Sequence, residues 1–366
     1  MTYLRAYAKL IQHPNFMMEK INYPQLYTKL TKGLSSKTKD IFDRRFGIKK
    51  SAKSKLGKGQ TVSIETLESI GDGLGITRER VRQIEEAGFN FIKKNNKELI
   101  EKICAEYTAY FESKGGFKKE EKVLADLGGD KSKPYVLFFL SLCGNFSRVA
   151  GKKDYAYFWS TLPNAEKHVK EQLDNLVQGI NEKGKLLEKP ALAAAFASQY
   201  SPEALASYLE ISKKIQENKE GRIGLITWPE IKPRGVKDKA YLVFKKHQKP
   251  LHFNQITSFI DELGVNEDSK KTHAQTVHNE LIKDARFVLV GRGTYALKEW
   301  GYVPGTIKDI ITKVITEKPH LVSQDEIVKE VLAQRLVAKN TVMINLNNKK
   351  YFQKDASGKY LVRESA

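Results

Sequence analysis

An internal repeat in the last third of the chain constrains the fold more than any other feature. At an offset of 65 residues, seven identities fall in register without a gap. The identical pairs are Thr276 and Thr341, Val277 and Val342, Leu281 and Leu346, Phe287 and Phe352, Gly293 and Gly358, Tyr295 and Tyr360, and Glu299 and Glu364. Self-similarity at a fixed spacing indicates one structural unit that is used twice.

Each copy of the repeat predicts the same small domain. Three amphipathic helical segments are followed by alternating segments around a glycine-containing turn, FVLVGRGTYALKEW in one copy and YFQKDASGKYLVRE in the other. Three helices followed by a β-hairpin make a winged helix. We therefore predict winged helices at 237–303 and 306–364.

The preceding region, 117–235, is harder to assign. FSRVAGKKDYAYFWS (146–160) and GRIGLITWPEI (221–231) each place a turn and an aromatic-rich strand after a helical stretch. One interpretation is two further, degenerate winged helices, although no gapless register supports it. Residues 1–33 are too few for a core of their own, and we predict only a helical segment there. The expected fold class is mainly α with small β-wings, an α+β chain.

Charge and composition exclude several classes of protein. Lysine and arginine number 63 against 43 acidic residues, a net charge of +20 that favours a polyanionic partner, nucleic acid first and an anionic membrane surface second. The longest apolar run, 135–144, is far shorter than the roughly 20 residues that a bilayer requires. The N-terminus lacks the layout of a signal peptide. Cys104 and Cys143 are too few for a disulfide framework or a four-ligand zinc site. We expect a cytosolic protein.

A helix-turn-helix is predicted within 65–94. Leu67, Ile70 and Leu74 form one apolar face, and a second helical pattern follows the GLGIT connection. Gly75 suits a left-handed turn, and Thr77 suits the N-cap of the second helix. Two short helices joined by such a turn are the helix-turn-helix unit. The helical signal continues toward 112, so the expected domain, 34–115, includes an extended helix.

The second helix carries the side chains that major-groove recognition requires. Arginine bonds bidentately to guanine, glutamine bonds to adenine, and glutamate accepts from cytosine. A side chain of each kind lies on one side of this helix, at Arg78, Arg82, Gln83 and Glu79. A solvated charged helix with pairs such as Arg82–Glu86 is the alternative, and periodicity alone does not separate the two.

A basic run precedes the helix-turn-helix. It contains Arg44, Arg45, Lys49, Lys50, Lys53, Lys55 and Lys58, with no acidic residue after the first of them. Such a run is typical of a solvated loop. Its position beside the helix-turn-helix makes phosphate contact the second interpretation.

These segments resemble a known family. LSSKTKDIFDRRFGI followed by TLESIGDGLGITRERVRQIEEA closely resembles region 4 of the housekeeping sigma factors of bacterial RNA polymerase, over roughly 34–94. In that family the helix reads the promoter −35 element, and the region also docks on the flap of the polymerase β subunit. The resemblance implies base reading by Arg78, Glu79, Arg82 and Gln83, with Thr77 and Arg80 near phosphates. The 33 preceding residues leave no room for a promoter-opening region, so we do not expect a complete sigma factor.

A second resemblance lies in the repeat. KAYLVFKKHQKPLHFNQI and TVHNELIKDARFVLVGRGTYALKEWGY, within 239–302, resemble the HARE-HTH domain, a winged helix present in the polymerase delta subunit, in chromatin-associated proteins and alongside restriction enzymes. Arg292, between two glycines at the tip of the hairpin, is a minor-groove candidate. The alternative is a turn that merely needs glycine. Lys349 and Lys350 suggest a phosphate-binding surface in the last repeat.

The expected function is a non-enzymatic, sequence-specific regulator of bacterial transcription that binds double-stranded DNA in the nucleoid. The alternatives are a delta-like accessory subunit that docks on core polymerase and a nucleoid-associated DNA-binding protein. Catalytic motifs are absent from the sequence, and the histidine pairs lie five residues apart, which does not suit a metal site on one helix face. We expect no cofactor, no metal and no membrane partner.

Overall fold

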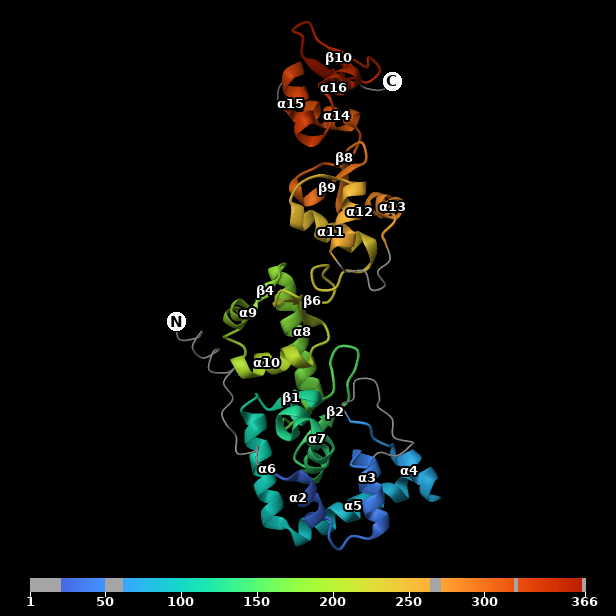
Figure 1. Ribbon diagram of the computed structural model, residues 1–366. Helices are drawn as coiled ribbons and strands as arrows, with labels where there is room; N and C mark the ends of the chain where they lie inside the picture. Colours follow the sequence, from blue (N-terminus) through green and yellow to red (C-terminus); the bar gives the residue numbers. More distant parts are fainter. Residues whose placement is uncertain (1–20, 50–61, 264–270, 319–321, 364–366) are drawn as a thin grey trace. The chain divides into compact units, whose positions relative to one another are not determined.

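The chain folds into two compact units, residues 1–227 and 228–366. The computed structural model describes residues 21–49, 62–263, 271–318 and 322–363, and each unit is considered by itself (Figure 1). The described segments are helices with four small antiparallel sheets, which confirms the expected α+β class.

The first unit begins with four helices, and α3 to α5 form the helix-turn-helix. The helices are α2 (Tyr23–Leu30), α3 (Ser36–Phe46), α4 (Leu67–Leu74) and α5 (Arg78–Asn95). Ser35 caps α3 by accepting a hydrogen bond from the Thr38 N–H at 3.1 Å. The helix ends at Gly47, whose φ of 72° suits glycine.

The next segment of the first unit is a winged helix. It consists of α6 (Lys97–Glu112), β1 (Phe117–Lys119), α7 (Glu120–Cys143), β2 (Ser147–Val149) and β3 (Phe158–Ser160), with strand order β1-β3-β2. Gly129, with φ 57° and ψ −166°, interrupts α7, so this element holds the second and third helices of the domain. The expected extended helix is therefore two helices, because α5 ends at Asn95 and α6 starts a new domain.

The first unit closes with a second winged helix that has the same topology. Its elements are α8 (Ala165–Lys183), β4 (Leu187–Glu188), α9 (Lys189–Ala195), α10 (Pro202–Ile211), β5 (Ile215–Glu217) and β6 (Arg222–Leu225), with strand order β4-β6-β5. The first strand pairs with the last, and the last pairs with the middle one, as in the domain before it.

The second unit contains the two copies of the sequence repeat. The third winged helix consists of α11 (Gly235–His247), β7 (Leu251–His252), α12 (Phe253–Glu262), α13 (Ala274–Lys283), β8 (Phe287–Gly291) and β9 (Thr294–Leu297), followed by η2 (Lys298–Trp300). The fourth consists of α14 (Ile307–Glu317), α15 (Gln324–Gln334), α16 (Lys339–Leu346), β10 (Phe352–Lys354) and β11 (Tyr360–Val362). Repeat-related tyrosines occupy the same place: Tyr295 pairs with Leu251, and Tyr360 pairs with Val322.

A buried arginine ties the two winged helices of the second unit together. Arg335 is only 4% exposed, and its Nη2 donates to the carbonyl oxygens of Val303 and Gly305, at 2.6 and 2.8 Å. The next N–H, from Leu336, donates to the Val290 carbonyl of β8 at 2.6 Å. The connection between the two domains is therefore hydrogen-bonded rather than a free linker.

In the first unit, the helix-turn-helix and the first winged helix share one core. Phe138 of α7 is fully buried, with its ring centroid 5.3 Å from that of Phe42 and 5.4 Å from that of Phe46. Phe89 of α5 lies 5.6 Å from the same ring. The apolar side of the helix-turn-helix is thus covered by α7, within the same chain.

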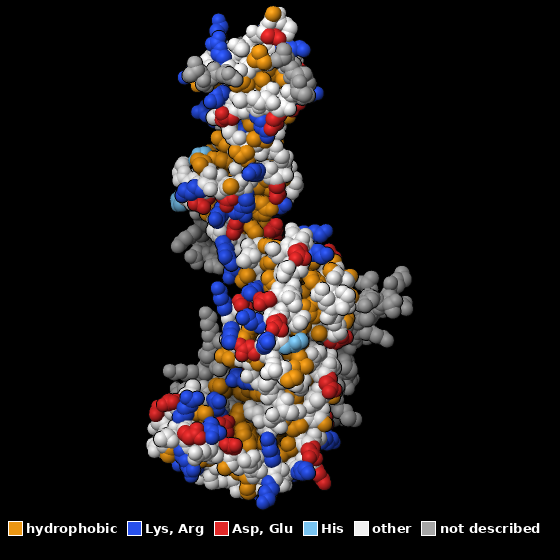
Figure 2. Space-filling model, turned by 180° about the vertical axis from the view of Figure 1, so that it is seen from behind, with side chains coloured by type: hydrophobic (Ala, Val, Ile, Leu, Met, Phe, Trp, Pro, Cys, Tyr) orange, Lys and Arg blue, Asp and Glu red, His pale blue; other side chains and the backbone are white. Residues whose placement is uncertain are grey.

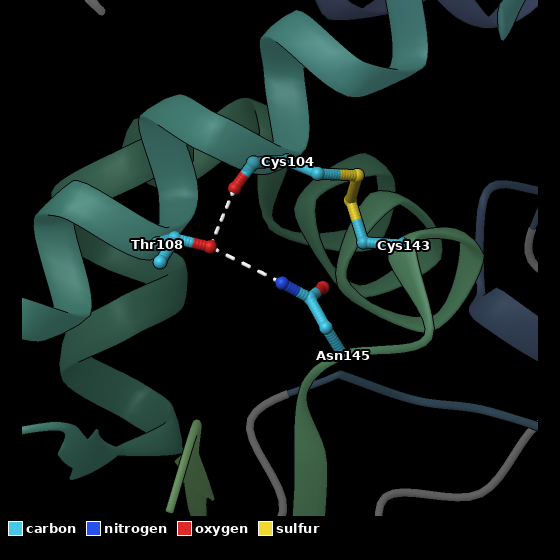
Figure 3. The surroundings of a disulfide bond; sticks show 4 residues. All are labelled: Cys104, Thr108, Cys143 and Asn145. Atoms are coloured by element: carbon cyan, nitrogen blue, oxygen red, sulfur yellow. Dashed lines mark hydrogen bonds between the residues drawn. A yellow bond between two sulfur atoms is a disulfide. The ribbon is translucent and has the colours of Figure 1, made fainter.

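A disulfide, which the sequence analysis did not anticipate, joins the first and third helices of the first winged helix. Cys104 of α6 is bonded to Cys143 at the end of α7 (Figure 3). The Thr108 hydroxyl donates to the Cys104 carbonyl at 2.8 Å and accepts from the Asn145 side chain at 3.1 Å. Two cysteines form no framework, but here they link the start and the end of one domain.

Candidate nucleic-acid interface

The turn between α4 and α5 has the geometry of a helix-turn-helix. Gly75 ends α4 with φ 64° and ψ 33°, and the Thr77 hydroxyl accepts from the Arg80 N–H at 3.2 Å, so both predicted roles are confirmed. A side chain at Gly71 would meet the Ile76 carbonyl oxygen at 2.6 Å, so the helix approaches the turn closely. Buried Ile41, Ile70 and Val81 hold the three helices together.

The solvent face of α5 carries the expected base-reading set. The side chains of Arg78, Glu79, Arg82 and Gln83 are exposed, as is that of Arg80, while Val81 points into the core. Figure 2 shows basic and acidic side chains interspersed at the lower left, where α4 and α5 lie in that view. One face of this helix therefore presents donors and acceptors together.

The charged side chains of this face pair with one another. Arg82 lies 2.7 Å from Glu79 and 3.0 Å from Glu86, and all three side chains are more than half exposed. The hydrogen bond from Arg82 lowers the pKa of Glu79, which therefore remains an ionised acceptor. Exposed pairs contribute at most about 1 kcal/mol, so exchanging them for contacts with bases costs little.

Two residues of the basic run are structural, which corrects their assignment to a solvated loop. Arg44 and Arg45 lie in α3, and Arg44 binds the buried Glu65 through Nε at 3.1 Å and Nη2 at 2.7 Å. Arg45 donates to the Glu65 carbonyl at 3.2 Å and lies 3.8 Å from Glu85. Both guanidinium groups fasten the segment before α4 onto α3, and their side chains are 14% and 29% exposed.

The rest of the basic run is only partly described. Lys49 is 81% exposed and lies 2.8 Å from the buried carboxylate of Asp43, which also accepts from the Tyr27 hydroxyl. That carboxylate raises the pKa of Lys49, which remains a surface cation. Lys50, Lys53, Lys55 and Lys58 lie outside the described residues.

The third helices of the first two winged helices are covered. Residues 132–143 of α7 and all of α10 are buried or half-buried. In α10 the Ser207 hydroxyl donates to the Lys114 carbonyl at 2.8 Å, and Glu210 lies 2.8 Å from Lys118. These helices pack against neighbouring domains of the first unit, so their surfaces are used inside the protein.

The third helices of the last two winged helices are open to solvent. In α13 the exposed residues are Gln275, Thr276, Asn279, Ile282 and Lys283, and in α16 they are Lys339, Asn340, Thr341 and Ile344. These two helices therefore offer surfaces that their counterparts in the first unit do not.

Arg292 lies at the exposed tip of the β8–β9 hairpin. Both flanking glycines have structural reasons: Gly293 has φ 67° and a side chain there would meet His252 at 2.5 Å, and one at Gly291 would meet the Leu336 carbonyl oxygen at 3.0 Å. The glycines alone therefore give no indication of DNA contact, and only the position of the arginine does.

Cations gather at the wing of the fourth winged helix. Lys349 and Lys350 are exposed, and the Lys308 and Lys350 ammonium groups lie 4.6 and 5.5 Å from the centre of the Tyr351 ring. Arg363 is also exposed and donates to the Lys349 carbonyl at 2.9 Å. This wing has the positive surface that phosphate contact requires.

The fold and these surfaces define a helix-turn-helix protein with tandem winged helices. Residues 32–94 match the family model of sigma-70, region 4, and residues 234–300 match that of HARE-HTH, the ASXL and restriction endonuclease HTH domain. Both are helix-turn-helix domains, and they support double-stranded DNA as the partner. No curated protein matches the chain. Within the described segments, no helix has the length and apolar character of a membrane span.

Proposed function

We propose that this chain is a sequence-specific, double-stranded DNA-binding regulator of transcription, with α5 in the major groove. The observation that carries the proposal is the exposed face of α5, where Arg82, Gln83 and Glu79 offer the groups that guanine, adenine and cytosine require. Arg78 extends this face, and Thr77 and Arg80 lie at the start of the helix beside the expected phosphates. The similarity to sigma region 4 makes bacterial transcription and the nucleoid the proposed setting.

The charged patches outside α5 have a second role in the proposal. Lys49, Arg292, Lys349 and Lys350 would hold phosphates beside the recognised sequence. Several small contacts in one chain raise affinity through effective concentration. These contacts would position the protein, and α5 would select the sequence.

The covered apolar face of the helix-turn-helix favours DNA over a protein as the first partner. Phe42 and Phe46 pack against Phe138 of the same chain, so this face offers no apolar groove to another protein. Docking on core RNA polymerase, as an accessory subunit, remains the second candidate, because the match to sigma region 4 covers α3 to α5.

Selection of bound duplexes from a random library tests the proposal. At about 150 mM salt, where nonspecific binding is weak, we expect an enriched motif that Arg82→Ala removes. Lys170→Ala, on the exposed surface of α8, is the matched control and should leave the motif unchanged. Binding without an enriched motif would contradict sequence reading and favour a nucleoid-associated role. Co-purification with core polymerase in the absence of DNA would favour the accessory subunit.

A further inference from the structure

The helix α16 exposes an unusual set of side chains. Its inner side is apolar and buried, with Val342 and Leu346 at 0% and 1% exposure. Its outer side carries Asn340, Thr341 and Ile344, and Ile344 is 73% exposed, more than any other large hydrophobic residue in the described part of the chain. The helix contains no acidic residue.

Asn340 and Ile344 are four residues apart, so they lie on the same side of the helix. In the major groove, adenine presents the acceptor and donor that an asparagine amide binds bidentately, and thymine presents a methyl group that apolar side chains contact. An amide and an aliphatic side chain on one face therefore match neighbouring A·T pairs. Neither group provides what guanine or cytosine requires.

The repeat-related helix supplies a comparison. At the offset of 65 residues, Gln275 and Asn279 of α13 correspond to Asn340 and Ile344. In α13 the two amides bind each other, with the Gln275 Nε2 donating to the Asn279 Oδ1 at 3.0 Å. In α16 the aliphatic side chain cannot form this bond, so its methyl groups face solvent.

Cations frame the outer face of α16. Lys339 precedes it, and Lys349 and Lys350 follow it, all of them exposed. The acidic neighbour of Lys339 is Asp325, at 3.9 Å, and both side chains are largely exposed. Phosphate contacts at either end would hold the helix against a groove.

We propose that α16 is a second base-reading helix, directed at A·T pairs, in which Asn340 binds adenine and Ile344 contacts the thymine methyl group. This proposal rests on the proposed binding of double-stranded DNA. It adds a second recognition element in the other compact unit, whereas α5 accounts for the guanine-, cytosine- and adenine-directed contacts.

Replacement of thymine by uracil removes only the methyl group, so it tests the contact directly. Full-length protein is titrated with a selected duplex in which successive blocks carry uracil. Loss of one buried methyl contact should weaken wild-type binding about fourfold at one block outside the α5 motif. Ile344→Ala should bind the thymine duplex about fourfold more weakly and show no further loss with uracil, as the coupling of two contacting groups requires.

Two variants complete the test. Ile282→Ala, which removes a similarly exposed isoleucine at the end of α13, should keep the wild-type response to uracil. Asn340→Ala should lose the preference for adenine beside the sensitive block. If wild type is indifferent to uracil in every block, or if Ile344→Ala responds as wild type does, the proposal is overturned.

The outcome is separate from that for α5. A motif that depends on Arg82 but not on uracil would leave the proposed function standing and remove this inference. If selection gives no motif, an A·T-rich duplex and its all-uracil counterpart replace the selected one, and the same dependence on Ile344 is expected.

Discussion

The third helices of the winged helices differ between the two compact units. In the first unit, α10 and the second half of α7 have no exposed residue beyond position 131, whereas α13 and α16 of the second unit each present an open face. The domains share a topology, yet those of the first unit use this helix to pack and those of the second unit leave it free. A shared fold therefore does not imply a shared role.

The difference follows from the residues of each helix. The sequence YVLFFLSL (135–142) is apolar on all sides and must be buried on all sides, because a helix of this kind has no face for water. In α16 and α13, polar side chains occupy one face. We infer that the first two winged helices hold the helix-turn-helix in place and that the last two keep their third helices available to a partner.

The largest expected effect comes from Phe138. Phe138→Ala should lower the free energy of unfolding of the first unit by about 3–5 kcal/mol, because the ring is fully buried among Phe42, Phe46 and Phe89. Denaturant unfolding of the full chain measures this loss. Ile344→Ala, on the exposed face of α16, should change stability by less than about 0.5 kcal/mol. Equal losses would remove the contrast between the helices.

The next effect is on binding. Arg82→Ala should weaken binding to the selected duplex by about 1–3 kcal/mol and relax the sequence preference, because a bidentate base contact is lost. Titration against matched and mismatched duplexes measures both quantities. Stability should hardly change, since the pairs of Arg82 with Glu79 and Glu86 are exposed. A uniform loss on all duplexes would refute base reading.

A smaller effect tests the packing of α10. Glu210→Ala should lower stability by about 1–2 kcal/mol, since it leaves the buried ammonium of Lys118 without its partner at 2.8 Å. Sequence preference should be unchanged, because the helix packs within the first unit. A change in the selected motif would show that α10 contacts DNA after all.

The smallest effect concerns the fourth wing. Lys349→Ala combined with Lys350→Ala should weaken binding to every duplex alike, and the slope of log affinity against log salt should fall by about one for each lost phosphate contact. Lys167→Ala combined with Lys170→Ala, on α8 of the first unit, provides the matched control. A salt slope that both pairs lower equally would contradict the division between the units.

Much of this organisation could be predicted from local sequence. Gly75 and Thr77 mark the turn of the helix-turn-helix because their conformational and capping preferences act within a few residues. The sequence repeat predicts the hairpins of the second unit, and Tyr295 and Tyr360 occupy equivalent places in them.

Long-range partners could not be predicted in this way. Arg44 belongs to a basic run by sequence, yet it binds Glu65, which lies 21 residues further along the chain. Cys104 and Cys143 carry no local signal of pairing across 39 residues. The burial of α10 depends on β1, which precedes it by more than 80 residues, so only the assembled unit reveals it.

Acetylation footprinting of lysines, read by mass spectrometry with and without the selected duplex, tests the central claim most directly. The account predicts that DNA protects Lys349, Lys350 and Lys339 of the fourth winged helix, and that Lys167 and Lys170 of the second remain as reactive as in the free protein. Protection of Lys167 and Lys170 equal to that of the fourth-wing lysines would contradict it.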